Sequence, residues 1–99
     1  MDGTSKYKAE KLVAVALGKL IGREYSRDGW LERLVREFEE ELRKINSECR
    51  VVMYGSSFSR DRVYYAEVAV KCGHERESVF ARIYVEHVQY IKVTGTMIE

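Results

Sequence analysis

The sequence predicts an α+β protein in which two N-terminal helices pack on one face of an antiparallel β-meander, in the order α-α-β-β-β. Two apolar stripes with helical spacing come first along the chain. From residue 50 to residue 94, long runs have an apolar side chain at every second position, which is typical of strands with one buried face. The 99 residues suit a single α+β domain over residues 1–99, without a linker or an internal repeat.

The first helix is expected over residues 6–21. Thr4 or Ser5 can cap its start by accepting a hydrogen bond from a free backbone N–H, and Gly22 suits its end. Its apolar residues fall on one stripe, which predicts the face that packs on the core. The stripe consists of Ala9, Val13, Ala16, Leu17, Leu20 and Ile21.

The second helix is expected over residues 29–45, starting after Ser26 or Asp28. Trp30, beside its start, is expected to pack on the core rather than to mark a contact surface. Both helices should lie across the same face of the sheet and form a two-layer sandwich with it. The apolar stripe of the second helix consists of Leu31, Leu34, Val35, Phe38, Leu42 and Ile45.

The strand register can be predicted from the alternation. A turn at residues 59–62, with Phe58 opposite Val63, sets Cys49 opposite Cys72 and places three further pairs on one face. These pairs are Val51 with Val70, Met53 with Val68 and Gly55 with Ala66. The polar loop at residues 73–78 then pairs Cys72 with Val79 and Val68 with Ile83, if the same face stays buried. The helix-covered face should hold Val51, Met53, Ala66, Val68, Val70, Ala81, Ile83 and Val85.

The segment after Val85 allows two interpretations. A single long strand could run over residues 79–94, or a loop of odd length could re-pair the end as a fourth strand. We prefer the long strand, because no Gly, Asn or Asp lies between Glu86 and Lys92 to form a tight turn. Its far half would offer free backbone groups to another chain, and Met97 and Ile98 could dock on a neighbour.

The uncovered sheet face is expected to be rich in aromatic residues. Cross-strand aromatic pairs can stabilise an exposed sheet, Tyr, Phe and Arg are enriched at homodimer interfaces, and aromatic rings can stack on single-stranded nucleic acid. We favour the homodimer interface, with nucleic-acid binding as the alternative. The expected face comprises Val52, Tyr54, Val63, Tyr65, Phe80, Tyr84, Val88 and Tyr90, with the charged residues Glu67, Lys71, Arg82 and Glu86. Arg60 and Arg62 could hold phosphates of a nucleic acid. The leading interface or nucleic-acid candidates are Tyr54, Tyr65, Phe80, Arg82, Tyr84 and Tyr90.

Cys49 and Cys72 are expected to be neighbours. Two buried thiols are the default inside cells, while a disulfide is known in intracellular proteins of hyperthermophiles. With His74 they could supply three zinc ligands, but no fourth ligand and no paired cysteine spacing accompany them.

No catalytic constellation can be assembled from the sequence, so we expect no enzyme, no metal, no cofactor and no small-molecule substrate. His87 is interpreted as a rim residue. The two helices do not suit a helix-turn-helix, because the connection is long and the second helix carries Glu37, Glu39, Glu40 and Glu41.

Charge is balanced overall but unevenly distributed. The formal net charge is +1, which gives no field that steers the chain to nucleic acid or to a membrane. Residues 1–27 hold six basic and three acidic groups, whereas residues 28–49 hold four and seven, which suggests mutual neutralisation or a self-complementary contact between copies. No apolar run could span a bilayer and no signal peptide is evident, so a cytoplasmic protein is expected.

A third of the residues are charged and none is proline, a composition that favours a thermostable protein with surface ion pairs. In composition and layout the chain resembles the small orphan α+β proteins of hyperthermophilic archaeal viruses, which are likewise short, Tyr-rich and charge-rich. The resemblance implies a viral protein in the host cytoplasm, often a dimer. No motif accompanies it, so it assigns no functional residue.

Overall fold

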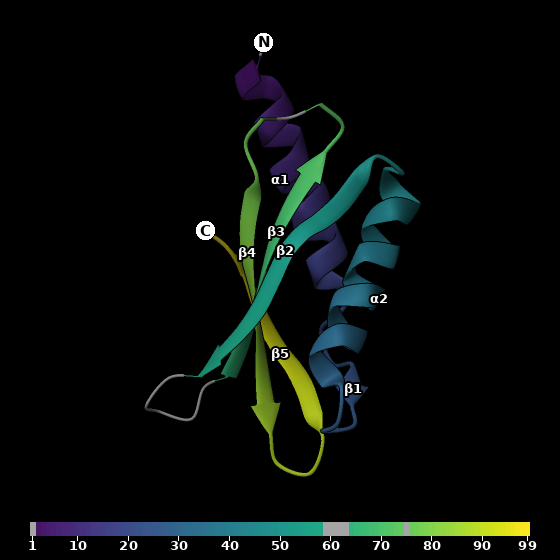
Figure 1. Cartoon of the computed structure of the whole chain (residues 1–99), viewed down its shortest axis with the longest axis vertical. Helices are drawn as coiled ribbons and strands as arrows, with labels where there is room; N and C mark the ends of the chain where they lie inside the picture. Colours follow the sequence, from purple (N-terminus) through teal and green to yellow (C-terminus); the bar gives the residue numbers. More distant parts are fainter. Residues whose placement is uncertain (1, 59–63, 75) are drawn as a thin grey trace.

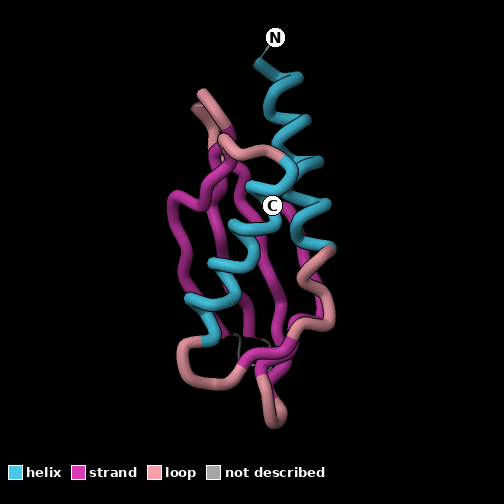
Figure 2. Tube along the Cα trace, turned by 90° about the vertical axis from the view of Figure 1, so that its right-hand side faces the viewer, coloured by secondary structure: helices cyan, strands magenta, loops and turns pink. Residues whose placement is uncertain are grey.

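Two helices lie across one face of a five-stranded antiparallel sheet (Figures 1 and 2). The computed structural model describes residues 2–58, 64–74 and 76–99. Strands are ordered β1-β5-β4-β3-β2 across the sheet. The elements are α1 (Asp2–Gly18), β1 (Glu24–Tyr25), α2 (Trp30–Ile45), β2 (Cys49–Phe58), β3 (Tyr64–Cys72), β4 (Val79–His87) and β5 (Ile91–Ile98).

The predicted α+β class and the two layers are confirmed, but the predicted order α-α-β-β-β is wrong. A strand, β1, lies between the helices, and four strands follow α2, the number that the alternative with a re-paired C-terminal strand gave. β1 pairs with β5 through Glu24 opposite Lys92 and Tyr25 opposite Ile91. It has only two residues, so it is too short to show an alternating pattern in the sequence.

α1 ends at Gly18, three residues earlier than predicted, and the chain turns before it reaches β1. Gly22 adopts φ 88° there, and its N–H donates to the carbonyl of Val93 over 2.9 Å. Ala9, Val13, Ala16, Leu17 and Leu20 are buried as predicted. Ile21 is exposed, since helical spacing no longer applies beyond the end of the helix.

α2 begins one residue later than predicted, after Gly29 in the left-handed region at φ 72° and without a side-chain cap. The expected cap at Ser26 or Asp28 is therefore wrong, and the Ser26 hydroxyl accepts a hydrogen bond from Arg33 instead. Trp30 packs partly buried against the core, as predicted. Leu34, Val35, Phe38 and Leu42 are buried, whereas Ile45 at the helix end is exposed.

β2 and β3 pair as predicted only where β2 begins and β3 ends. Cys49 lies opposite Cys72 and Val51 opposite Val70, but a bulge follows. Beyond it Met53 pairs with Ala69 and Tyr54 with Val68, so Val52 and Met53 together oppose one residue. The predicted pairs Met53 with Val68, Gly55 with Ala66 and Phe58 with Val63 are wrong, because this extra residue shifts all later partners by one. The predicted turn at 59–62 lies outside the described residues, as do Arg60, Arg62 and Val63.

β3 and β4 keep the predicted face but not the predicted partners. Val70 pairs with Val79 and Ala66 with Ile83, two residues away from the expected register. A shift of two leaves each side chain on the same face. Val68, Val70, Ala81, Ile83 and Val85 are accordingly buried beneath the helices.

The preferred long C-terminal strand is wrong. Residues 88–90 form a three-residue connection, and β5 returns along β4. This is the arrangement that the alternative with an odd-length loop described. Val85 pairs with Val93 and Tyr84 with Gly95, so a second bulge lies at Thr94. Met97 pairs with Arg82 and Ile98 with Ala81 of the same chain, which replaces the expected docking on a neighbour.

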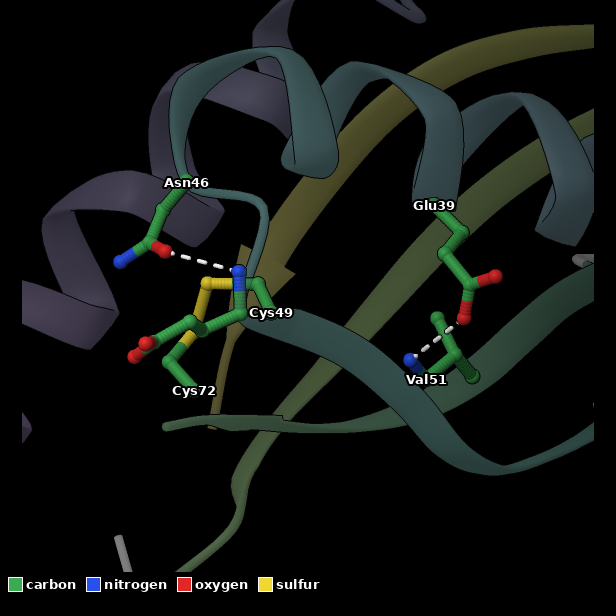
Figure 3. Close-up of a disulfide and its surroundings, with 6 residues drawn as sticks. Glu39, Asn46, Cys49, Val51 and Cys72 are labelled. Atoms are coloured by element: carbon green, nitrogen blue, oxygen red, sulfur yellow. Dashed lines mark hydrogen bonds between the residues drawn. A yellow bond between two sulfur atoms is a disulfide. The ribbon is translucent and has the colours of Figure 1, made fainter. Parts of the chain in front are cut away.

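A carboxylate on α2 closes part of the outer edge of β2. Glu39 Oε2 accepts a hydrogen bond from the Val51 backbone N–H over 2.8 Å (Figure 3). α2 packs over β2 and β1, while α1 covers β3, β4 and β5. The sheet twists strongly, so the far half of β2 runs away from α2 (Figure 1).

Candidate interaction face

The face of the sheet opposite the helices, called here the outer face, is organised in rows of paired residues. One row is apolar and runs from Met53 through Ala69 to Phe80. The next runs from Gly55 through Glu67 and Arg82 to Met97, and a third contains Tyr65 and Tyr84. The outer face therefore places an apolar row, a charged row and an aromatic row side by side.

The apolar row borders a hollow of about 240 Å³. Ala69 is only 2% exposed although no helix covers it, because Met53 and Phe80 flank it in the register. Met53 is 62% exposed and Phe80 is 48% exposed. The hollow is lined by Met53, Tyr54, Gly55, Glu67, Val68, Ala69, Phe80, Ala81 and Glu99.

Arg82 is held by partners on all sides. Its Nε donates to Glu99 Oε1 and lies 3.4 Å from Glu67 Oε1. Its guanidinium carbon lies 4.7 Å from the centroid of the Tyr65 ring, within cation–π range. Hydrogen bonding to Tyr84 and to Glu99 raises the pKa of Arg82 above its usual value. The arginine is thus a fixed cation that joins the charged row to the aromatic row.

Tyr65 and Tyr84 form the aromatic row, with ring centroids 5.8 Å apart and planes inclined by 59°. One is already in contact with Arg82, so these rings serve a cross-strand cluster within the chain. This arrangement favours the stabilising interpretation of the aromatic pair over an open stacking platform.

Four of the six predicted candidates lie together on the outer face, namely Tyr65, Phe80, Arg82 and Tyr84. Tyr54 does not, because the bulge pairs it with Val68 of the helix-covered face. It is nevertheless 48% exposed. Tyr90 lies in the loop between β4 and β5, beside a second hollow, because the predicted long strand is a hairpin.

Besides Gly55, which the bulge moves to the outer face, sequence reasoning missed several residues there, among them Met53, Met97 and Glu99. Met53 was expected under the helices, and the bulge moves it to the outer face. Met97 and Glu99 reach the outer face only because β5 returns along β4. Four consecutive apolar residues, 51–54, hide the alternation at the start of β2, and this run was the available signal for a bulge.

Cys49 and Cys72 form a disulfide that joins the first residue of β2 to the last residue of β3, with the sulfurs 2.11 Å apart (Figure 3). The default expectation of two free thiols is thus wrong, and the disulfide alternative describes the structure. Both sulfurs are used in this bond, so the expected zinc option with His74 has no thiolate ligands. Among the described residues, no group of three or more His, Cys, Asp or Glu could hold a metal ion.

On the helix side, a polar cluster joins the β1 segment to α2. Arg23 donates to Glu37 Oε1 over 2.7 Å and to Glu41 Oε2 over 2.9 Å. The Lys44 ammonium lies 3.0 Å from the buried Glu41 carboxylate, and the Tyr25 hydroxyl donates to Glu37. Arg23 belongs to the basic first segment and the carboxylates to the acidic second one, so part of the charge asymmetry is neutralised within the chain.

This cluster shifts three pKa values. Burial opposes the charge of Arg23, but its bonds to Glu37 and Glu41 outweigh burial and raise its pKa. The bond from Lys44 lowers the pKa of Glu41 below its usual value, against a desolvation effect in the other direction. Burial first, and then the Glu37 charge, raises the pKa of Tyr25 to about 12. These shifts hold Arg23 and Glu41 charged and Tyr25 neutral near neutral pH.

No helix among the described residues is long and apolar enough to cross a membrane. Comparisons with protein-family models, with curated proteins and with solved structures found no match to this chain.

Proposed function

We propose that the protein is a small homodimeric interaction or structural protein without catalytic activity, and that the apolar surface around the β2 bulge is its contact region. The contact region is defined as Val52, Met53, Tyr54 and Phe80. The observation that carries the proposal is the apolar hollow on the outer face, which two of these side chains flank while largely exposed.

Exposure and charge both support a protein partner. Val52, Met53 and Tyr54 are consecutive, and all are exposed. Aromatic residues and Met are enriched at the centres of protein interfaces, and an arginine with fixed neighbours suits their rim. Arg82, Glu67 and Glu99 provide that rim beside Phe80.

The alternative, nucleic-acid binding, receives less support from the same face. Glu67 and Glu99 flank Arg82, so phosphates would meet carboxylates beside the cation. The Tyr65 ring is already in contact with Arg82 and Tyr84, which leaves less of its surface for a base.

Sedimentation equilibrium over micromolar concentrations tests the proposal. We expect a dimer for the natural chain and a dissociation constant raised at least tenfold by Met53→Glu, because a charge would be buried in the contact. The matched control is Val15→Glu, since Val15 is similarly exposed but lies on α1, which covers the other face of the sheet.

A monomer at tens of micromolar would overturn the proposal. Equal weakening by Val15→Glu and Met53→Glu would also overturn the assignment of the surface. Circular dichroism of both variants establishes that the fold is retained.

A further inference from the structure

The two edges of the sheet differ in regularity. On one side the two-residue β1 covers only Ile91 and Lys92 of β5, and the rest of that edge is β5 itself, which a bulge at Thr94 interrupts. β2 ends it on the other side with ten residues, and residues 51–58 contain no charge and no proline. Long uncharged edge strands are templates for pairing with another chain, whereas short and charged ones are not.

The backbone of β2 alternates between groups that bond β3 and groups that point outward. The Val51 N–H points outward, because Glu39 on α2 accepts its hydrogen bond. Val51 lies opposite Val70, and beyond the bulge Tyr54, Ser56 and Phe58 lie opposite Val68, Ala66 and Tyr64. Since these partners follow one another at every second position of β3, Tyr54, Ser56 and Phe58 also present their backbone N–H and C=O groups to the outside.

The first half of this edge is already closed. Glu39 occupies the N–H of Val51, and the bulge at Val52 and Met53 breaks the regular spacing. The regular outward-facing ladder therefore covers Tyr54, Ser56 and Phe58, with Ser56 at its centre.

We propose that β2 of one copy pairs antiparallel with β2 of a second copy, with Ser56 opposite Ser56 on the two-fold axis. This inference rests on the proposed homodimer and specifies how the β2 part of its contact region pairs. In this register Tyr54 lies opposite Phe58 of the second copy. All three outward-facing residues of each copy then meet an outward-facing residue of the other, which satisfies every free donor and acceptor of the regular ladder. The two sheets become one continuous sheet of ten strands.

A second copy fits this edge because the same segment is complementary to itself. An uncharged strand meets an identical strand without like charges facing each other. A stable interface buries roughly 800 Å² per partner, more than one added strand alone provides. Tyr54 is 48% exposed and lies on the paired ladder itself, so its side chain can supply additional apolar contact.

Single-cysteine variants test the register. The two natural cysteines are joined to each other, so an introduced cysteine is the only free thiol. Under mild oxidation, Ser56→Cys should form a covalent dimer, because directly opposite residues stand about 5.5 Å apart between Cα atoms. Ser57→Cys and Gly55→Cys are the matched controls, since each would lie about 8 Å from its own copy, too far for a disulfide. Gly55 has no atom within 4 Å of an added Cβ, so its replacement fits the monomer.

Amide hydrogen exchange of the natural protein provides an independent measurement. Exchange at Tyr54 and Ser56 should slow as the protein concentration rises through the dimerisation range, because the added strand takes those N–H groups. Ser56→Lys should dissociate the dimer by placing like charges opposite each other, and Ser57→Lys should leave it intact.

The outcomes separate the two proposals. A natural dimer in which Ser56→Cys fails to cross-link and the Tyr54 and Ser56 amides stay unprotected would overturn the strand pairing and leave the homodimer standing. Cross-linking by Ser57→Cys in preference to Ser56→Cys would overturn the register. A natural chain that stays monomeric would overturn both.

Discussion

Tyr25 shows how one side chain connects the shortest strand to a helix. Its ring is buried, and its hydroxyl donates to Glu37 on α2 over 3.1 Å. The neutral phenol is favoured in the folded chain, so its pKa is raised to about 12. A group with a raised pKa stabilises the fold fully below the pKa of the unfolded chain, and that stabilisation is lost as the pH rises through the folded pKa.

We therefore expect the free energy of unfolding to fall between about pH 10 and about pH 12, with Tyr25 contributing about 2–3 kcal/mol of the loss. Tyr25→Phe should remove this part of the pH dependence, because it has no ionisable hydroxyl. Urea denaturation at pH 8 and pH 11 captures about half of this loss, about 1.4 kcal/mol. Tyr90→Phe is the control, since Tyr90 lies half-exposed in the β4–β5 loop. An unchanged pH slope in Tyr25→Phe would contradict the prediction.

Residue alternation predicted burial well wherever the backbone stayed regular. Val68, Val70, Ile83 and Val85 are buried as expected, because parity survives a register shift of two. It failed for Met53, where one inserted residue reversed the face. The partners of Arg23 could not be predicted, since they depend on how a two-residue strand is placed against α2.

β2 contains one half of the disulfide, the backbone N–H that binds Glu39 of α2, and the bulge. The disulfide fastens its first residue to the last residue of β3, and Glu39 binds the backbone two residues later (Figure 3). The α2–β2 connection is short and ordered by Asn46, whose side-chain oxygen accepts from the Glu48 N–H. The start of β2 is thus fixed from both sides, while its far half is free at the edge.

Removing the disulfide should lower the free energy of unfolding by about 3 kcal/mol. This is the contribution expected from the loop-closure entropy of the unfolded chain for cysteines 23 residues apart. Thermal unfolding of the double variant Cys49→Ala/Cys72→Ala measures the loss. Added reductant should leave the double variant unchanged and should lower the melting temperature of the natural chain. A double variant as stable as the natural chain would contradict the prediction.

The range of α2 could be predicted more closely than the strand connections. Helical stripes are local, and α2 lies within one residue of its expected range. The β4–β5 hairpin lacks the Gly, Asn or Asp that marks a tight turn, so its three-residue connection has no clear sequence signal. The C-terminal end of the sheet, and with it Met97 and Glu99 on the outer face, therefore could not be placed in advance.

Across the whole molecule, basic and acidic groups are nearly equal in number, and several of them form ion pairs with each other. Its formal net charge is +1, and the basic first segment meets the acidic second one through Arg23. On the outer face, Arg82 lies between Glu67 and Glu99. In these two described clusters each cation is paired with carboxylates, so neither adds to the continuous positive field that draws polyanions.

We expect the protein to pass through a single-stranded DNA column at about 0.15 M salt. Retention that falls steeply with salt, and that is lost in the double variant Tyr65→Ala/Phe80→Ala, would instead support nucleic-acid binding on the outer face. Retention that survives in this double variant would exclude those rings as the binding surface.

The two-fold symmetry of the proposed β2 pairing sets a limit on assembly. A sheet that recruited copy after copy through two open edges could grow into a fibre. Joining two copies through β2 uses the β2 edge of both, so this contact closes at a pair. Further growth would have to use the other side of the sheet, where β1 pairs only with Ile91 and Lys92 of β5.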